Sequence, residues 1–287
     1  MRHEIAMRIE IDGGRLFFDV VGAKLVPDGS RMIERPTVIA LHGGPGGDHS
    51  YLKYELAPLA DVAQLVFPDM RSTGRSDHTS SERWSVYRWA DDVRALCGAL
   101  EIEKPIVLGH SYGGYVAIAY ASRYPDHPGK LILYGAEARQ HAAESLETFR
   151  RLGGARAYRA AKKFFDGPNL KTGVAFTKHC LPLYTRKPEE DLNKHMRMLA
   201  NGEMTMQLLQ SELRTIDLTP HMGSIRCPTL ILSGEDDPAC PVEGAMEMAA
   251  LLPAQLVRFE RISNAGHSVL NDQPELALRI LRDFIAS

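Results

Sequence analysis

The segment GHSYG at 109–113 places Ser111 between two glycines and matches the pattern G-x-S-x-G. An apolar run at 105–108 precedes it, and another at 115–120 follows it. In this pattern a buried strand turns sharply into a helix and holds the serine hydroxyl at the turn as a nucleophile. A plain helix N-cap is the alternative, because serine also suits that position. The succession of strand, turn and helix favours the nucleophile.

A nucleophilic serine needs a histidine to take its proton, and the histidine needs a carboxylate to fix its tautomer. The segment LILSGEDDP at 230–238 ends an apolar run with three acids, at the strand end where the sites of parallel sheets gather. Of Glu235, Asp236 and Asp237, we favour Asp237 because it lies furthest into the loop. The histidine is then His267, the only one downstream of these acids. A lone loop histidine is otherwise most often a solvated surface residue.

A glycine-rich loop, HGGPGG at 42–47, follows another apolar run and lets the backbone approach a ligand closely. The amide of Gly44 in this loop and the amide of Tyr112 would together stabilise an oxyanion. The loop lacks the Lys-Ser/Thr pair of a phosphate-binding P-loop and the spacing of dinucleotide-binding glycines. A flexible turn is the alternative explanation. We expect His42 to shape the loop rather than to take part in the chemistry.

Short apolar runs alternate with helical patterns, which predicts a parallel sheet wound by right-handed crossovers. The runs cover 37–44, 63–69, 105–110, 130–136, 228–237 and 255–262, and the main helical patterns cover 85–101, 112–123, 241–252 and 274–286. Residues 5–22 alternate around an Asp-Gly-Gly turn and predict an opening β-hairpin. A polar connection is expected to follow it.

The alternation stops between residues 137 and 222, where the sequence has helical spacing and no convincing strand. The helical segments are HAAESLETFRRL, ARAYRAAKKFF, PEEDLNKHMRML and MTMQLLQSEL. An ordinary crossover needs only about a dozen residues plus loops, so this stretch is too long to be one. We therefore predict a core domain formed by 1–136 and 223–287, with 137–222 as a helical cap inserted over the sheet.

The composition of the chain indicates which kinds of molecule it can bind. The 287 residues include 34 basic and 36 acidic ones, which are mixed along the chain and give a net charge of −2. The sequence therefore has no cluster of basic residues that would bind nucleic acid or an anionic membrane. It also has no apolar stretch that would suit a signal peptide or a membrane-spanning helix. We expect a cytoplasmic protein with a small-molecule substrate, reduced and scattered cysteines, and neither metal nor cofactor. The sequence leaves the oligomeric state open.

Five motifs, in their order and separations, resemble those of the α/β-hydrolase superfamily: HGGPGG, DMRSTGRSD, GHSYGG, GEDDP and NAGH. Two of them, HGGPG and GRSD, are most similar to the proline iminopeptidase group of serine aminopeptidases. The resemblance implies a mostly parallel central sheet with helices on both faces and a helical cap. The roles it implies are nucleophile for Ser111, acid for Asp237, base for His267, and oxyanion donors for Gly44 and Tyr112.

The same resemblance implies a substrate that is presented by its free amino group. Aminopeptidases of this group hold the amine with carboxylates, and Glu203 in LANGEMTMQ is the nearest match, with Gly43 as a further substrate contact. Pro238 stands where some relatives have a second amine-binding acid. A carboxylesterase or lactonase is therefore the alternative to an aminopeptidase or amidase. A non-catalytic binding protein is disfavoured because every catalytic element is present.

Overall fold

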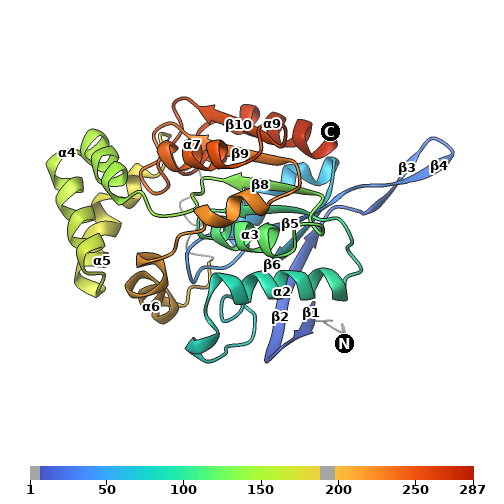
Figure 1. The fold of residues 1–287 in the computed structure, drawn as a ribbon, viewed down its shortest axis with the longest axis horizontal. Coiled ribbons are helices and arrows are strands. Elements are labelled where there is room, and N and C mark those ends of the chain that lie inside the picture. The colour runs from blue at the N-terminus through green and yellow to red at the C-terminus, as the bar shows by residue number, and fades with distance from the viewer. Residues whose placement is uncertain (1–6, 188–197) are drawn as a thin grey trace.

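A computed structural model describes residues 7–187 and 198–287. Among these residues an eight-stranded sheet has the order β1-β2-β6-β5-β7-β8-β9-β10 (Figure 1). Neighbouring strands are parallel from β6 to β10, whereas β1 and β2 form the expected antiparallel hairpin at one edge. The strands are Arg8–Ile11 (β1), Gly14–Val21 (β2), Thr37–Leu41 (β5), Gln64–Pro68 (β6), Ile106–His110 (β7), Lys130–Tyr134 (β8), Thr229–Gly234 (β9) and Val257–Ile262 (β10). The predicted mostly parallel sheet is confirmed.

Helices cover both faces of this sheet (Figure 1). Their bounds are Ser50–Leu56 (α1), Val86–Ala99 (α2), Tyr112–Arg123 (α3), Ala142–Asp166 (α4), Leu170–His179 (α5), Gly202–Gln210 (α6), Val242–Leu251 (α7), Val269–Asp272 (α8) and Pro274–Ala286 (α9). Residues of α2, α3 and α7 belong to one hydrophobic core, and residues of α1 and α9 belong to another. The expected α/β architecture with helices on both faces is therefore present.

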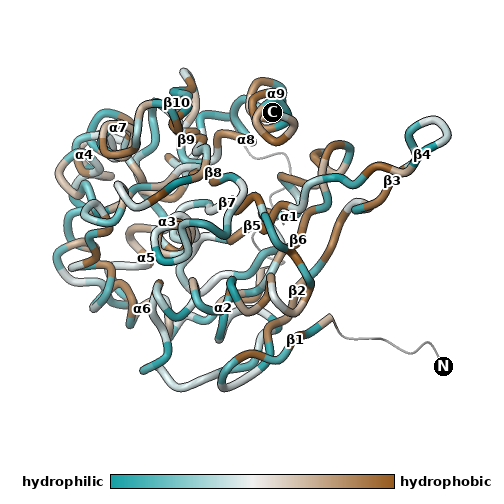
Figure 2. The backbone as a smooth tube through the Cα atoms, turned by 45° about the vertical axis from the view of Figure 1, so that its right-hand side comes forward, coloured by the Kyte–Doolittle hydropathy of each residue, from teal (hydrophilic) through white to brown (hydrophobic). Residues whose placement is uncertain are grey.

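Strand β5 shows why its sequence is apolar without interruption. Ile39 and Leu41 belong to the core shared with α2 and α3, whereas Val38 and Ala40 belong to the core shared with α1 and α9. Successive side chains of a strand point to opposite faces, so a strand covered on both sides must be apolar at every position. A helix on the outside of the molecule is covered on one side only, and α9 accordingly alternates apolar and polar colours in Figure 2. Helix α3, in contrast, is buried at every position from Tyr112 to Ala121.

Residues 25–34 form a β-hairpin where a polar connection was expected. Strands β3 (Leu25–Asp28) and β4 (Arg31–Glu34) pair with each other in a separate two-stranded sheet. The hairpin projects away from the rest of the ribbon in both Figure 1 and Figure 2. The two residues of its turn are Gly29 and Ser30, which lie between the paired Asp28 and Arg31, and Gly29 has φ 59°. Gly-Ser between two strands is a signal for a two-residue hairpin turn, but Pro27 interrupts the first run, and a proline within a run argues against a strand.

We call residues 137–222 the cap segment. Helices α4, α5 and α6 lie in it. The segments HAAESLETFRRL and ARAYRAAKKFF both fall in α4, which is kinked at Gly154 (φ 66°), and MTMQLLQSEL overlaps α6, whereas none of the predicted segments corresponds to α5. Residues 188–197 of PEEDLNKHMRML lie outside the described residues. A small core of their own holds α4 and α5 together, with Phe149 packed against Phe165 and Phe176, whereas Met204 and Leu208 of α6 belong to the core shared with α2 and α3. Figure 1 shows α4 and α5 at the end of the molecule opposite the β3–β4 hairpin.

Candidate active site

Ser111 joins β7 to α3 with backbone angles that side chains rarely adopt, φ 54° and ψ −122°. Its amide donates a hydrogen bond to the carbonyl of Tyr134 in the neighbouring strand (3.1 Å). The glycines on either side are required by space, because a Cβ on Gly109 would overlap the carbonyl of Gly113, and a Cβ on Gly113 would overlap that of Leu41. Strain of this kind persists where the surrounding structure enforces it, often at functional residues.

The alternative role of Ser111 as an ordinary helix cap fits the structure poorly. Within the described part of the chain, its hydroxyl makes no capping hydrogen bond to α3. An N-cap residue also has extended backbone angles, unlike the positive φ seen here. The sharp turn instead presents the side chain to a cavity, of which Ser111 forms part of the wall.

Asp237 and His267 form a hydrogen-bonded pair. His267 Nδ1 lies 2.8 Å from Asp237 Oδ2, and the second carboxylate oxygen accepts the amides of Ala239 (2.8 Å) and Cys240 (2.9 Å). Because an ionised carboxylate only accepts hydrogen bonds, it selects the imidazole tautomer with its proton on Nδ1. That tautomer leaves Nε2 able to accept a proton, as a general base requires.

The two neighbouring acids are engaged elsewhere. Asp236 accepts a hydrogen bond from Arg151 of α4 (2.5 Å), and Glu235 accepts one from Arg261 of β10 (2.5 Å). Both pairs involve half-exposed arginines. Of the three acids considered from the sequence, the structure therefore brings Asp237 to the histidine.

The surroundings of His267 strengthen it as a base. Its imidazole is 5% exposed and packs against the rings of His110 (4.9 Å between centroids) and Tyr184 (5.2 Å). Burial alone disfavours the imidazolium, but the negative charge and hydrogen bond of Asp237 outweigh it and raise the pKa of His267 above its usual 6.5. The fold thus favours the proton on this ring once it has been taken up.

A cavity of about 300 Å³ lies beside Ser111, between the sheet and the cap segment. Its lining brings together Ser111, Tyr112 and Gly44, three of the residues expected from the sequence. The apolar wall comes from the cap segment and consists of Phe164, Phe165, Phe176, Leu181, Tyr184, Leu209 and Leu213. The cavity therefore suits a small substrate with an apolar group.

The two glycines of the loop have different positions. Gly43 packs behind Ser111, where its amide donates to the hydroxyl of Tyr51 (2.6 Å) and a Cβ would lie 2.8 Å from the Cβ of Ser111. Gly44 lines the cavity and adopts φ 139°, which favours glycine. The amide of Gly43 is thus already used, whereas Gly44 lines the cavity beside Ser111.

Glu203 is not brought to the cavity. It lies on the exposed first turn of α6 and is absent from the described residues that form the cavity wall. The carboxylate in that wall is Glu137, which follows the end of β8. The sequence contained a signal for it, because an acid just beyond a buried strand was the same argument that selected Asp237.

Glu137 is buried, and both of its carboxylate oxygens accept hydrogen bonds. Its Oε1 accepts the hydroxyl of Tyr115 (3.0 Å), and its Oε2 accepts the amide (3.2 Å) and Nδ1 (3.0 Å) of His141. Burial raises the pKa of Glu137 despite these contacts. The hydrogen bond that His141 donates to Glu137 in turn raises the pKa of His141. The pair places a titratable polar group at one end of a mostly apolar cavity.

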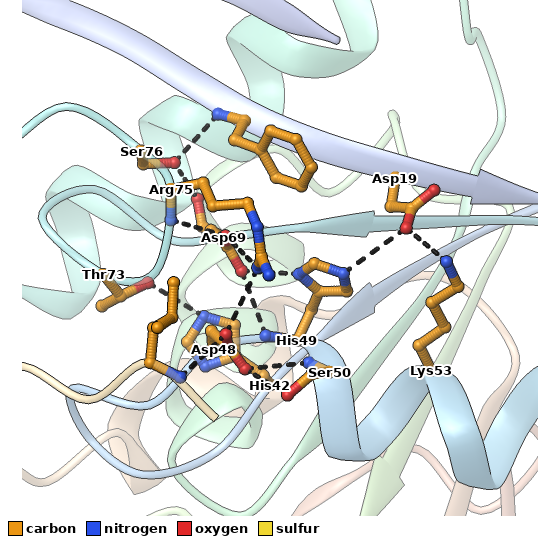
Figure 3. Close-up of polar contacts among 12 residues, drawn as sticks. Asp19, His42, Asp48, His49, Ser50, Lys53, Asp69, Thr73, Arg75 and Ser76 are labelled. Atoms are coloured by element: carbon orange, nitrogen blue, oxygen red, sulfur yellow. Dashed lines mark hydrogen bonds and ion pairs between the residues drawn. The ribbon is translucent and has the colours of Figure 1, made fainter. Parts of the chain in front are cut away.

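Buried polar contacts brace the loop that carries Gly44 (Figure 3). The His42 Nδ1 donates to the carbonyl of Gly43 (2.9 Å), and its Nε2 accepts the amide of Met70 (3.1 Å). Burial lowers the pKa of His42, so it stays neutral. Asp69 accepts both the amide (3.1 Å) and Nδ1 (2.6 Å) of His49. These side chains stiffen the loop, as expected for His42.

Other site chemistries have little support in the described residues. No group of three or more histidines, cysteines or acids is placed there to hold a metal ion. The four cysteines are buried and unpaired with one another. None of the helices in this part of the chain is long and apolar enough to cross a membrane.

The chain belongs to the α/β hydrolase fold family, whose model matches residues 36–274. It is 28% identical to a proline iminopeptidase, PfmaB, of Pestalotiopsis fici, over 96% of this chain and 98% of that one. A solved esterase from Thermogutta terrifontis is 26% identical and covers 98% of this chain with 97% of its own (TM-score 0.72). A proline iminopeptidase of Mycobacterium smegmatis has the same fold (20% identity, 97% of both chains, TM-score 0.77). The protein is thus a hydrolase similar to proline iminopeptidases, as the sequence motifs indicated.

Proposed function

We propose that the protein is a serine hydrolase in which Ser111 attacks the carbonyl carbon of a small substrate and forms an acyl-enzyme. His267 takes the proton of Ser111 and passes it to the leaving group, while Asp237 holds the imidazole and stabilises its charged form. Water then repeats the sequence and releases the acid. The observation that carries the proposal is the buried, hydrogen-bonded pair of His267 and Asp237. This pair lies at the carboxyl ends of the parallel strands, where the strained turn at Ser111 also lies.

The amides of Gly44 and Tyr112 are the proposed oxyanion donors. Both residues line the cavity together with Ser111, and Tyr112 is the first residue of α3, where amides have no partner inside the helix. The helix dipole adds to the attraction for negative charge at this end. Losing one such donor typically lowers the rate by about 100-fold or more.

For the substrate, we infer a short peptide or amide that presents a free amino group. Glu137 supplies the negative charge for that group when His141 is neutral, and the aromatic wall takes an apolar side chain. The similarity to PfmaB, a proline iminopeptidase, supports this class. Glu137 thus takes the part that the sequence resemblance implied for Glu203.

An ester or lactone is the second candidate. The chemistry at Ser111 would be the same, and the mostly apolar wall of the cavity would accept such a substrate without an amine. The relative from Thermogutta terrifontis is described as an esterase. The two substrate classes differ in whether the Glu137 carboxylate contributes to binding.

One panel of substrates separates these candidates. Alanyl and prolyl arylamides, their N-acetyl forms and nitrophenyl esters would be compared at neutral pH with the wild type and Ser111→Ala. A fluorophosphonate should label the wild type and not Ser111→Ala, which should lose activity by about 1,000-fold or more. A wild-type protein that resists labelling would contradict the serine mechanism.

The amine preference is tested by Glu137→Gln, with Glu203→Gln as a matched control on the exposed turn of α6. Glu137→Gln should raise KM for free-amine arylamides about tenfold, as expected for a lost charge-assisted hydrogen bond. Glu203→Gln should leave KM unchanged. Equal turnover of free and acetylated arylamides, with faster hydrolysis of esters, would favour the second candidate instead.

A further inference from the structure

The start of α6 in the cap segment is bonded directly to the backbone of the loop that carries Gly44. Thr205 Oγ1 donates to the carbonyl of Pro45 (2.7 Å), and the amide of Asn201 donates to the carbonyl of Gly46 (2.7 Å). The Thr205 hydroxyl also lies 3.0 Å from the carbonyl of Asn201, one helical turn back, but the contact to Pro45 is shorter. A cap side chain thus reaches the carbonyl of Pro45, the residue that follows the proposed oxyanion donor Gly44.

The fit between α6 and this loop is close. Gly46 has φ 86°, and a Cβ there would lie 2.5 Å from Thr205 Oγ1 and 2.6 Å from the carbonyl of Asn201. The side chain of Asn201 extends the contact by donating from Nδ2 to the carbonyl of Ser72 (3.0 Å). Because four of the six residues in HGGPGG are glycines, the loop has little stiffness of its own. Contacts from outside must fix its position.

The second proposed oxyanion donor is also bonded to the cap segment. The hydroxyl of Tyr112 donates to Glu212 Oε2 (2.8 Å), and Glu212 Oε1 accepts the amide of Val86 at the start of α2 (3.1 Å). The Tyr112 ring stands edge-on to Trp89 of α2, with 5.6 Å between the ring centroids. Glu212 therefore fixes the side chain of the residue whose amide faces the oxyanion.

We propose that Thr205 and Glu212 are positioning residues that hold the Gly44 and Tyr112 amides in the geometry needed by the transition state, so that the oxyanion hole is complete only when the cap segment is seated. This inference rests on the proposed function. Neither side chain is needed to donate to the substrate carbonyl. Because oxyanion stabilisation depends on donors placed within about 3 Å of the developing charge, small displacements of the loop or of Tyr112 should slow catalysis more than they weaken binding.

The first test replaces Thr205 with valine, which removes the hydroxyl and keeps a similar shape. We expect kcat to fall about tenfold, part of the loss seen when a whole oxyanion donor is removed, with KM within about twofold. Thr205→Ser keeps the hydroxyl and should restore kcat. Thr177→Val makes the same change at an exposed position of α5 and serves as the matched control.

The second test concerns Glu212. Glu212→Met removes both acceptor oxygens and keeps a side chain of similar length, while Tyr112→Phe removes the hydroxyl and keeps the ring. Both should lower kcat. A trifluoromethyl ketone, which forms an oxyanion on the serine, should lose affinity by the same factor as kcat/KM falls. A role limited to stability would change the thermal midpoint and leave this correlation absent.

The outcomes are distinct. Unchanged kcat and unchanged ketone affinity in Thr205→Val and Glu212→Met, or effects confined to KM, would overturn the inference while a fluorophosphonate-labelled wild type upholds the proposed function. A wild type that does not label would overturn both. Titration with the fluorophosphonate gives the fraction of folded sites in each variant. If Thr205→Val does not fold, Glu212→Met and Tyr112→Phe decide the question.

Discussion

The proton on His267 is subject to two opposing influences, its burial and the charge of Asp237. The second prevails and raises the pKa above 6.5, so the neutral base needed for attack on the substrate is lost as pH falls through this raised value. We predict an acid limb of kcat/KM whose midpoint lies above pH 6.5. An N-acylated nitrophenyl ester is the suitable substrate, because it has no amine and does not depend on Glu137. A midpoint at or below 6.5 would contradict the expected influence of Asp237.

The raised pKa of His267 also makes the stability of the fold depend on pH, and stability changes with pH in the opposite direction to activity. Because the fold raises the pKa of His267, the native state binds its proton more tightly than the unfolded chain. The contribution of His267 to the free energy of unfolding is therefore fully present below pH 6.5 and is lost as pH rises through the raised pKa. Catalysis thus uses the form of His267 that contributes less to stability, as is common at functional sites.

The turn from β7 to α3 gives a prediction at the scale of elements. In an ordinary helix interior, replacing glycine by alanine stabilises by up to about 1 kcal/mol. At Gly113 we expect the reverse, a loss of about 1–3 kcal/mol or more, because the added Cβ would overlap the backbone carbonyl of Leu41. Gly223→Ala is the control, since a Cβ there meets nothing within 4 Å. Urea unfolding measures the free energy of unfolding of both variants. Equal stability of the two variants would contradict the close approach of α3 to β5.

The elements that position the site could be predicted because their signals are local. Apolar runs predicted every strand from β5 to β10, and an acid after a strand marked Asp237. The same signal marked Glu137, but the resemblance to aminopeptidases favoured Glu203 as the amine-binding carboxylate. What a cap helix presents to the cavity depends on how it packs, for instance on Phe149 against Phe176. Such contacts between segments far apart in sequence leave no periodic pattern.

At the scale of the molecule, the segments at the two ends of the sheet differ in how much the activity depends on them. The cap segment lies at one end and contributes the cavity wall and the contacts of Thr205 and Glu212. The β3–β4 hairpin lies at the other end (Figure 1), and Leu25, Met32 and Ile33 on it are exposed. Variation at the first end should alter activity, whereas variation at the second should alter neither activity nor the core.

Removal of the hairpin tests this division. The amide of Arg35 donates to the carbonyl of Lys24 (2.7 Å) at the base of the hairpin. A bond of the same kind closes a two-residue turn, so an Asn-Gly turn can replace residues 25–34. Among the described residues β3 pairs only with β4, and an isolated hairpin contributes little stability. We predict a thermal midpoint within about 2 °C of the wild type, as for a surface change worth about 0.5 kcal/mol or less, and unchanged kcat/KM. A larger fall in the midpoint, or a change of sedimentation coefficient beyond that due to the lost mass, would show that the hairpin contacts the core or a second copy of the chain.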